Sequence, residues 1–189
     1  TSLVKALLEQ DAHLKVCVSH TTRPRRPTET DGLNYHFVDR PDFQALIERH
    51  EFLEHADVFG NFYGTARSSV SDCFATGADV ILEIDWQGAA QVRSRHPEAV
   101  SVFILPPSKA TLRARLTARG EDTTDVIENR LAQARTELEH HDEFDYLVVN
   151  DEFSIALNEL QAIVAAERAR KPIASRRLSG LLRDLLSAP

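Results

Sequence analysis

Residues 80–88 have the sequence Val-Ile-Leu-Glu-Ile-Asp-Trp-Gln-Gly. Apart from Glu83, the first five residues are apolar, which is typical of a strand covered on both faces of a parallel sheet. Two further apolar runs, Val100 to Leu105 and Tyr146 to Val149, predict buried strands, and a shorter strand-like run lies at 16–18. Because helical patterns separate these runs, we expect an α/β fold with a mostly parallel sheet.

The segment 30–65 breaks this alternation. Residues 35–38 alternate in polarity, and Gly60-Asn61 is a turn signal between two strand-like runs. We therefore expect a strand-rich insertion here, with antiparallel pairing as one arrangement. At the end of the chain, residues 176–186 predict a basic amphipathic helix with leucines on one face.

Composition narrows the classes of function. A length of 189 residues favours one domain, and a net charge of −7 disfavours broad binding to nucleic acid or to an anionic membrane. No apolar run approaches the roughly 20 residues of a membrane-spanning helix. Two cysteines make no disulfide framework, and the eight histidines show no zinc spacing. We expect a cytoplasmic protein in a reducing compartment.

Ligands of parallel α/β folds bind beyond the carboxyl ends of the strands, so the residues after each apolar run are the first candidates for chemistry. Arg23, Arg25 and Arg26 follow the first run, and guanidinium groups match phosphate oxygens in pairs. The alternative is a solvated basic loop. Asp85 ends the run at 80–84, where a carboxylate suits a nucleotide enzyme or simply caps the next helix.

Arginines also follow the strand that ends at Leu105. Arg115 and Arg119 lie four residues apart and share a helix face, and Arg130 lies on the next predicted helix. Such a helical hairpin could close over a polyphosphate, while ordinary surface arginines are the alternative. Asn150 follows the last strand and either contacts a base or turns the chain.

Together these residues resemble the guanylate kinase family, especially its bacterial type. The stretches that carry the resemblance are Ser19-His20-Thr21-Thr22-Arg23 with Arg26, Gly32 with Tyr35, Phe52-Leu53-Glu54-His55-Ala56, Gly60-Asn61-Phe62-Tyr63-Gly64-Thr65, Asp85-Trp86-Gln87-Gly88, Phe103-Ile104-Leu105-Pro106-Pro107-Ser108, Arg119-Gly120 and Val149-Asn150-Asp151. They occur in order across about residues 1–170.

The resemblance implies a P-loop nucleotide kinase fold in one domain. The core would comprise residues 1–19, 80–108 and 142–170, with a GMP-binding insertion at about 20–79, a helical lid at about 109–141 and a C-terminal helix at 173–189. The implied reaction transfers the γ-phosphoryl group of ATP to GMP, with Mg²⁺, and gives ADP and GDP. The alternative is a catalytically inactive domain of the same fold that binds GMP but not ATP.

The resemblance also assigns residues to roles. The GMP-binding set is Ser19, Arg23, Arg26, Tyr35, Glu54, Tyr63, Thr65, Glu83 and Asp85; the catalytic set is Arg115, Arg119 and Arg130; and the ATP-binding set is Thr1 and Asn150, with Thr1 as a weak candidate ligand of Mg²⁺. Glu54 matches the residue that distinguishes guanine from adenine. Its carboxylate can accept hydrogen bonds from guanine N1–H and the N2 amino group, donors that adenine lacks on that edge.

The phosphate-binding loop of the family, G-x-x-x-x-G-K-[ST], does not occur in the sequence, and Thr1 aligns with its final hydroxyl residue. We expect that residues precede Thr1 in the full chain and supply this loop, and the kinase prediction depends on it. The expected partners are ATP and GMP, with dGMP as a further acceptor, and neither a membrane nor nucleic acid. A homo-oligomer is compatible with the sequence.

Overall fold

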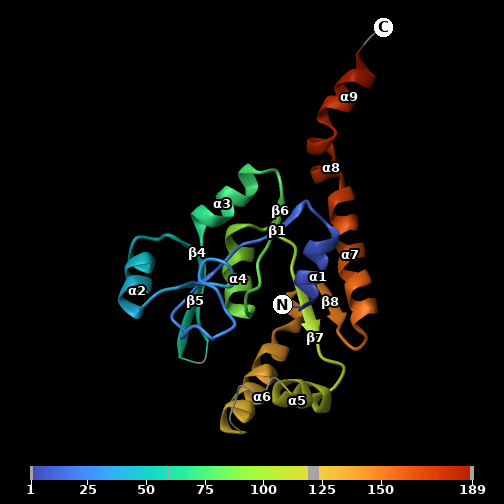
Figure 1. Ribbon diagram of the computed structural model, residues 1–189. Helices are drawn as coiled ribbons and strands as arrows, with labels where there is room; N and C mark the ends of the chain where they lie inside the picture. The colour runs from blue at the N-terminus through green and yellow to red at the C-terminus, as the bar shows by residue number, and fades with distance from the viewer. Residues whose placement is uncertain (1, 59, 119–123, 188–189) are drawn as a thin grey trace.

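The computed structural model describes residues 2–58, 60–118 and 124–187 (Figure 1). The helices are α1 (Ser2–Gln10), α2 (Arg40–Glu48), α3 (Arg67–Ala75), α4 (Trp86–Arg95), α5 (Lys109–Ala118), α6 (Thr124–Glu139), the 3-10 helix η1 (His141–Glu143), α7 (Phe153–Ala169), α8 (Lys171–Arg177) and α9 (Ser179–Leu186). The strands are β1 (Leu14–Val16), β2 (His20–Thr21), β3 (His36–Phe37), β4 (Phe52–Val58), β5 (Asn61–Ala66), β6 (Asp79–Ile81), β7 (Val102–Leu105) and β8 (Tyr146–Val149).

The core strands are parallel, as the sequence predicts, and they form two pairs. β1 pairs with β6, and β7 pairs with β8, with Val102 opposite Tyr146 and Leu105 opposite Val149. Among the described residues, no strand hydrogen bonds join β6 to β7. The main apolar cluster lies where α1 and α7 pack on these strands, and it comprises Leu3, Leu7, Leu14, Val148, Ala156, Leu157 and Leu160.

The expectation that these strands are covered on both faces is wrong. Val148 is 1% exposed, whereas its neighbours Leu147 and Val149 are 49% and 46% exposed. Successive side chains of a strand point to opposite faces, so α1 and α7 cover one face of the β7–β8 pair and leave the other open. In the expected strand at 80–84, Glu83 is exposed and its neighbours are only half-buried.

The strand-rich insertion is confirmed as a four-stranded sheet in the order β3-β2-β5-β4. β2 is parallel to β3, while β5 runs antiparallel to both β2 and β4. Helix α2 begins after Asp39, whose side chain accepts a hydrogen bond from the Asp42 backbone N–H, and Pro41 fits its first turn. Phe43 of α2 is fully buried and packs against Phe52 and Phe62 of the sheet.

Two helical segments complete the molecule. α5 and α6 form the pair at the bottom of Figure 1, within the predicted lid. The expected single C-terminal helix is instead two short helices, α8 and α9, which extend away from the body beyond α7 (Figure 1).

Among the described residues, no helix combines the length and apolar character needed to cross a membrane. The exact boundaries between core, insertion and lid stay predictions.

Candidate active site

A cavity of about 150 Å³ opens between the insertion sheet and the start of α4. Six residues of the predicted GMP-binding set line it: Ser19, Tyr35, Glu54, Tyr63, Glu83 and Asp85. Ser19 follows β1 and Tyr35 directly precedes β3. Glu54 lies on β4 and Tyr63 on β5, while Glu83 and Asp85 follow β6. The fold therefore brings together side chains that are up to 66 positions apart in the sequence.

Glu54 is the most deeply buried charged residue of this cavity, with only 3% of its surface exposed. It lies on β4 opposite Thr65 of β5. Burial raises the pKa of its carboxyl group, and nearby Asp85 raises it further, while hydrogen bonding from Thr65 acts in the opposite direction. A buried carboxylate is costly unless it is partnered, so this side chain is suited to accept hydrogen bonds from a ligand.

Helix α4 holds the outer edge of β4 beside the cavity. The Gln91 side chain donates to the His55 carbonyl at 2.7 Å and accepts from the His55 backbone N–H at 3.2 Å. Gly88, in the first turn of α4, lies so close to Glu54 that a Cβ atom there would be 2.5 Å from its Oε2. Sequence reasoning missed Gln91, and it quoted Gly88 without a role.

Ser19 and Asp85 flank Glu54 from other segments. The Ser19 hydroxyl lies 2.9 Å from the Thr65 hydroxyl, and Thr65 is fully buried. Asp85 caps α4, because its Oδ1 accepts from the Gly88 backbone N–H at 2.9 Å and its Oδ2 accepts from Gln87 Nε2 at 3.1 Å. Asp85 therefore caps the helix, as one alternative predicted, and also lines the cavity.

The predicted phosphate clamp forms an aromatic and cationic cluster beside the cavity. The rings of Tyr35 and Tyr63 are 5.8 Å apart, and the Arg23 guanidinium lies over the Tyr35 ring at 5.6 Å. Burial and the neighbouring Tyr63 raise the pKa of Tyr35. Arg26 lies in the same loop, where its backbone N–H donates to Glu29 at 2.8 Å.

Glu29 organises this loop, and sequence reasoning gave it no role. Its Oε1 lies 2.6 Å from Nη2 of Arg23, with both side chains mostly buried. Burial disfavours the charged form of Arg23, but its hydrogen bond and charge interaction with Glu29 outweigh this and raise the pKa of Arg23. The same hydrogen bond lowers the pKa of Glu29, so the pair stays ionised near neutral pH.

The lid residues lie apart from this cavity. Arg115 is on α5, and its Nη1 donates to the Asn150 carbonyl at 2.8 Å, which joins a predicted catalytic residue to a predicted ATP-binding residue. Arg130 is half-buried on α6. Neither arginine lines the cavity that contains Glu54. Thr1 and Arg119 lie outside the described residues.

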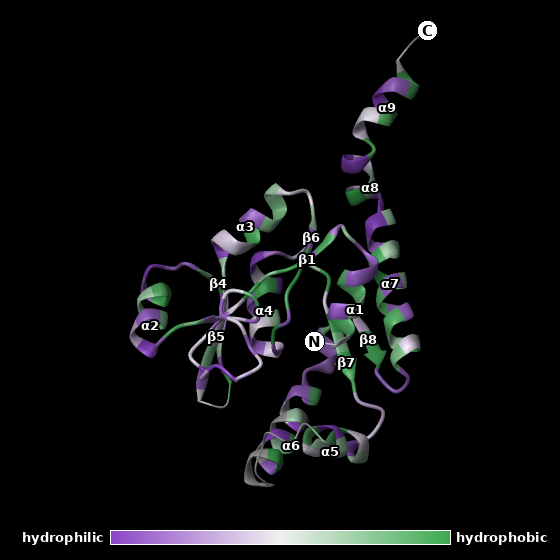
Figure 2. Cartoon of the chain, in the orientation of Figure 1, coloured by the Kyte–Doolittle hydropathy of each residue, from purple (hydrophilic) through white to green (hydrophobic). Residues whose placement is uncertain are grey.

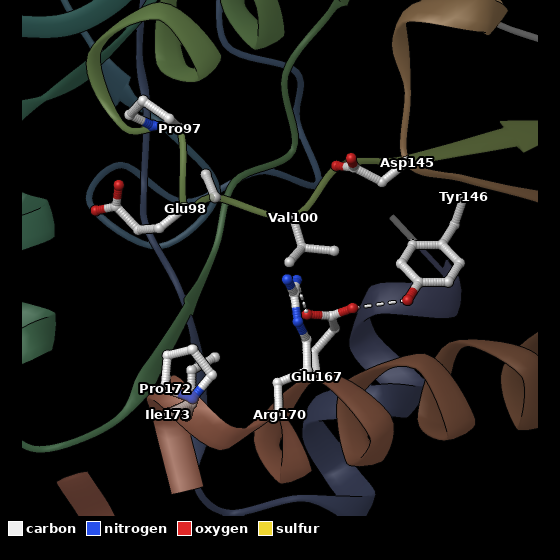
Figure 3. A pocket seen from close by; sticks show the side chains of 10 residues that line it. Pro97, Glu98, Val100, Asp145, Tyr146, Glu167, Arg170, Pro172 and Ile173 are labelled. Carbon is white, nitrogen blue, oxygen red and sulfur yellow. Dashed lines mark hydrogen bonds and ion pairs between the residues drawn. The ribbon is translucent and has the colours of Figure 1, made fainter. Parts of the chain in front are cut away.

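A larger cavity of about 480 Å³ lies elsewhere, between the start of β8 and the junction of α7 with α8 (Figure 3). Its polar groups are bonded to one another: the Tyr146 hydroxyl donates to Glu167 at 2.6 Å, and Arg170 Nη1 lies 3.0 Å from Glu167. Asp145 accepts from Ser101. Although this cavity is larger, its side chains are already paired, so the smaller cavity is the better candidate site.

The part of the chain that the structure describes holds no group of three or more histidine, cysteine, aspartate or glutamate side chains placed to bind a metal. Of the carboxylates that line the cavity around Glu54, Asp85 has both oxygens engaged at the start of α4.

Comparison with known proteins adds independent information. The family model described as guanylate kinase matches residues 1–167. Guanylate kinase of Alkalilimnicola ehrlichii is 58% identical over 98% of this chain and 92% of its own length, and that of Hahella chejuensis is 53% identical over 100% and 90%. The crystal structure of guanylate kinase from Anaplasma phagocytophilum has a TM-score of 0.77 at 36% identity and covers 90% of this chain and 82% of that one. The long match, the shared fold and the cavity around Glu54 agree, and the chain belongs to the guanylate kinase family of enzymes.

Proposed function

We propose that this chain transfers the γ-phosphoryl group of ATP to GMP and binds GMP in the cavity around Glu54. The match to the guanylate kinase family over residues 1–167 supports this reaction. The observation that carries the binding site is the convergence of Ser19, Glu54 and Asp85 with the Arg23 cluster around one cavity.

The guanine base is the group that Glu54 recognises. Its carboxylate accepts hydrogen bonds from N1–H and the N2 amino group, which offsets the cost of burying the charge. AMP offers neither donor on that edge and leaves the buried carboxylate without a partner. Such an unpaired group lowers kcat/KM for the wrong nucleotide by roughly 10⁴-fold or more. The hydroxyls of Ser19 and Thr65 and the Asp85 carboxylate surround the same carboxylate and complete the polar wall for the base.

The phosphate of GMP binds at the aromatic and cationic cluster. Arg23 and Arg26 supply charge, and the hydroxyls of Tyr35 and Tyr63 supply hydrogen bonds. Glu29 holds Arg23 in place before the nucleotide arrives. Because the Arg23 side chain is already held, it loses little conformational entropy when the phosphate binds, and this favours affinity.

Phosphoryl transfer itself needs position and charge more than acid–base chemistry. An oxygen of the GMP phosphate attacks the γ-phosphorus of ATP as the bond to ADP breaks, and the attacking oxygen is already anionic. The barrier therefore lies in bringing two anions together and in the charge spread over the transferred group. Arg115, Arg119 and Arg130 are the proposed residues that neutralise this charge, and Asn150 lies at the proposed ATP side.

Mg²⁺ enters this scheme as part of the substrate MgATP. It neutralises charge on the β- and γ-phosphates. The proposed protein contact to it is the Thr1 hydroxyl. We also propose a cytoplasmic location, which the low cysteine count supports.

An assay of product formation tests the function. Incubating the protein with MgATP and GMP should yield ADP and GDP in equal amounts by chromatography, and AMP in place of GMP should give no more ADP than a reaction without an acceptor. GMP binding by calorimetry without any ADP or GDP would instead support the inactive binding domain. Absence of both GMP binding and turnover would overturn the proposal.

A further inference from the structure

The end of helix α6 meets the start of helix α4 through a pair of stacked rings. His140 follows the last residue of α6, and Trp86 is the first residue of α4. Their ring centroids lie 3.6 Å apart and the ring planes differ by 7°, so each ring covers one face of the other. The stack joins the predicted lid to the helix whose N-cap residue, Asp85, lines the cavity around Glu54.

Hydrogen bonds hold the His140 ring in this position. Its Nδ1 lies 2.6 Å from Oε1 of Glu143, and Nη2 of Arg93 on α4 lies 2.7 Å from Oε2 of Glu143. Nη1 of Arg93 also donates to the Glu143 carbonyl at 2.8 Å. Arg93 lies about two turns after Trp86 on α4. Helix α4 therefore holds His140 directly through Trp86 and indirectly through Glu143.

The same side of α6 also approaches the cavity residue Asp85. Glu137 lies three residues before His140 and shares its side of the helix. Burial raises the pKa of Glu137, and the neighbouring charge of Asp85 raises it further. Arg130 lies about two turns before Glu137 and is therefore on that side of α6 as well. Because a helix is stiff, the place where His140 is fixed sets where Arg130 lies relative to the cavity.

The end of α6 that meets the core is mostly hydrophilic, as Figure 2 shows. Residues 139–143 have the sequence Glu-His-His-Asp-Glu. Such a segment gains little free energy from the burial of apolar surface. Directed contacts such as the Trp86–His140 stack therefore set its position.

We propose that His140 is a positioning residue for phosphoryl transfer, because its stack on Trp86 sets α6 against α4 and so places Arg130 relative to bound GMP. This inference rests on the proposed function, in which Arg130 neutralises charge on the transferred group. His140 acts through Trp86 and α6, and its role requires no contact with either nucleotide. The competing explanation is a contact that only stabilises the fold.

Variants of the ring test this role by steady-state kinetics. His140→Ala removes the stack and should lower kcat at least about tenfold with the KM for GMP changed less than about threefold, because a small displacement of a group that stabilises the transition state is costly. His140→Phe keeps a flat ring but loses the hydrogen bond to Glu143, and it should retain kcat within about threefold. His140→Asn keeps a polar group near the position of Nδ1 but lacks the ring, and it should behave like H140A.

His141→Ala is the matched control. His141 is the next residue, it is exposed, and its Nδ1 lies 2.8 Å from the carbonyl of Leu138 in the same turn. This variant should change kcat by less than about twofold. Urea denaturation of each variant shows whether it is folded under the assay conditions. A folded H140A with unchanged kcat, or an H140F that loses as much kcat as H140A, would overturn the proposal.

Trp86 is the single tryptophan of the chain, so its fluorescence reports the stack independently of activity. Loss of the His140 ring uncovers one face of the indole, and acrylamide should therefore quench the emission of H140A and H140N more strongly than that of H140F, H141A or the unchanged protein. Equal quenching in all five proteins would overturn the proposal. An unchanged protein that gives no ADP or GDP would overturn the proposed function together with this role. Equal losses of kcat in H140A and H141A, in a protein that is otherwise active, would overturn the role of His140 alone.

Discussion

Gly88 shows how one missing side chain shapes the candidate GMP site. A Cβ atom at this position would meet Glu54 Oε2 at 2.5 Å and the Ile84 side chain at 3.2 Å. Glu54 is almost fully buried, with 3% of its surface exposed. The absent side chain thus lets the positive end of the α4 dipole approach a buried carboxylate.

Replacing Gly88 with alanine should therefore displace the Glu54 carboxylate. We expect the KM for GMP to rise at least about tenfold with kcat changed less than about threefold, because a loss of about 1.4 kcal/mol in binding is tenfold. Steady-state kinetics with GMP varied measures this. Gly180→Ala is the control, since nothing lies within 4 Å of a Cβ atom there. An unchanged KM in G88A would contradict the inference.

Glu54→Gln tests the role of the carboxylate itself. An amide keeps one acceptor but turns an N–H₂ group toward the guanine donors, so we expect a higher KM for GMP and a fall of about 10²-fold in the preference for GMP over AMP. The ratio of kcat/KM for the two nucleotides is the measurement. Glu48→Gln, on the exposed surface of α2, is the control. Unchanged discrimination would remove Glu54 as the residue that reads the base.

At the scale of elements, the helical pair α5–α6 carries Arg115 and Arg130, two of the proposed catalytic arginines, which do not line the cavity around Glu54. Arg113 of α5 is paired with Glu128 of α6, which joins the two helices. Arg115 reaches back to the carbonyl of Asn150 at the end of β8. The lid helices are thus attached to the core at the strand end where ATP is proposed to bind, and α6 presents Arg130.

Arg130→Ala should lower turnover far more than affinity. Removing an arginine that stabilises charge in the transition state costs about 10³-fold in kcat, while the KM for GMP should change less than about threefold. Arg135→Ala, an exposed arginine on the same helix, is the matched control and should retain activity. Equal losses in kcat and in GMP affinity for R130A would refute this role.

At the scale of the whole molecule, Arg168 joins the two halves of the core. It stands near the end of α7, which packs on β8, and its guanidinium contacts Asp11 after α1 at 2.5 Å and Asp79 of β6 at 2.6 Å. Because β6 and β7 share no hydrogen bonds among the described residues, contacts through α1 and α7 connect the two strand pairs. The hydrogen bond from Arg168 is the main cause that lowers the pKa of Asp11.

The lowered pKa of Asp11 makes part of the stability depend on pH. Its contribution is present above the unfolded-state pKa of about 3.9 and is lost as the pH falls through the lower folded-state pKa. Asp11→Asn should therefore lower the free energy of unfolding by about 1 kcal/mol at pH 7, an amount reduced by partial exposure, and by much less near about pH 2.5. Urea denaturation at both pH values measures this, with Glu9→Gln as the control. A difference that is the same at both pH values would contradict the assignment.

Several local elements and the class of reaction were predictable from the sequence. The run at 146–149 forms β8 with the predicted bounds, since a dense β-branched and apolar run has one favourable local conformation. The motifs from Ser19 to Asp85 indicated which side chains belong together, because the family match preserves their order. The basic tail was also visible as an amphipathic pattern, although its division into α8 and α9 was not.

Contacts between residues that are distant in the sequence, by contrast, could be found only once the elements were packed together. The exposure of Leu147 and the close approach of Gly88 to Glu54 depend on neighbours far away in sequence. The hydrogen-bonded ion pair between Arg23 and Glu29 depends on how the loop folds back over six residues. Periodicity encodes the direction of a side chain relative to its own element, but a contact depends on where a second element lies, and that is set by the packing of the whole chain.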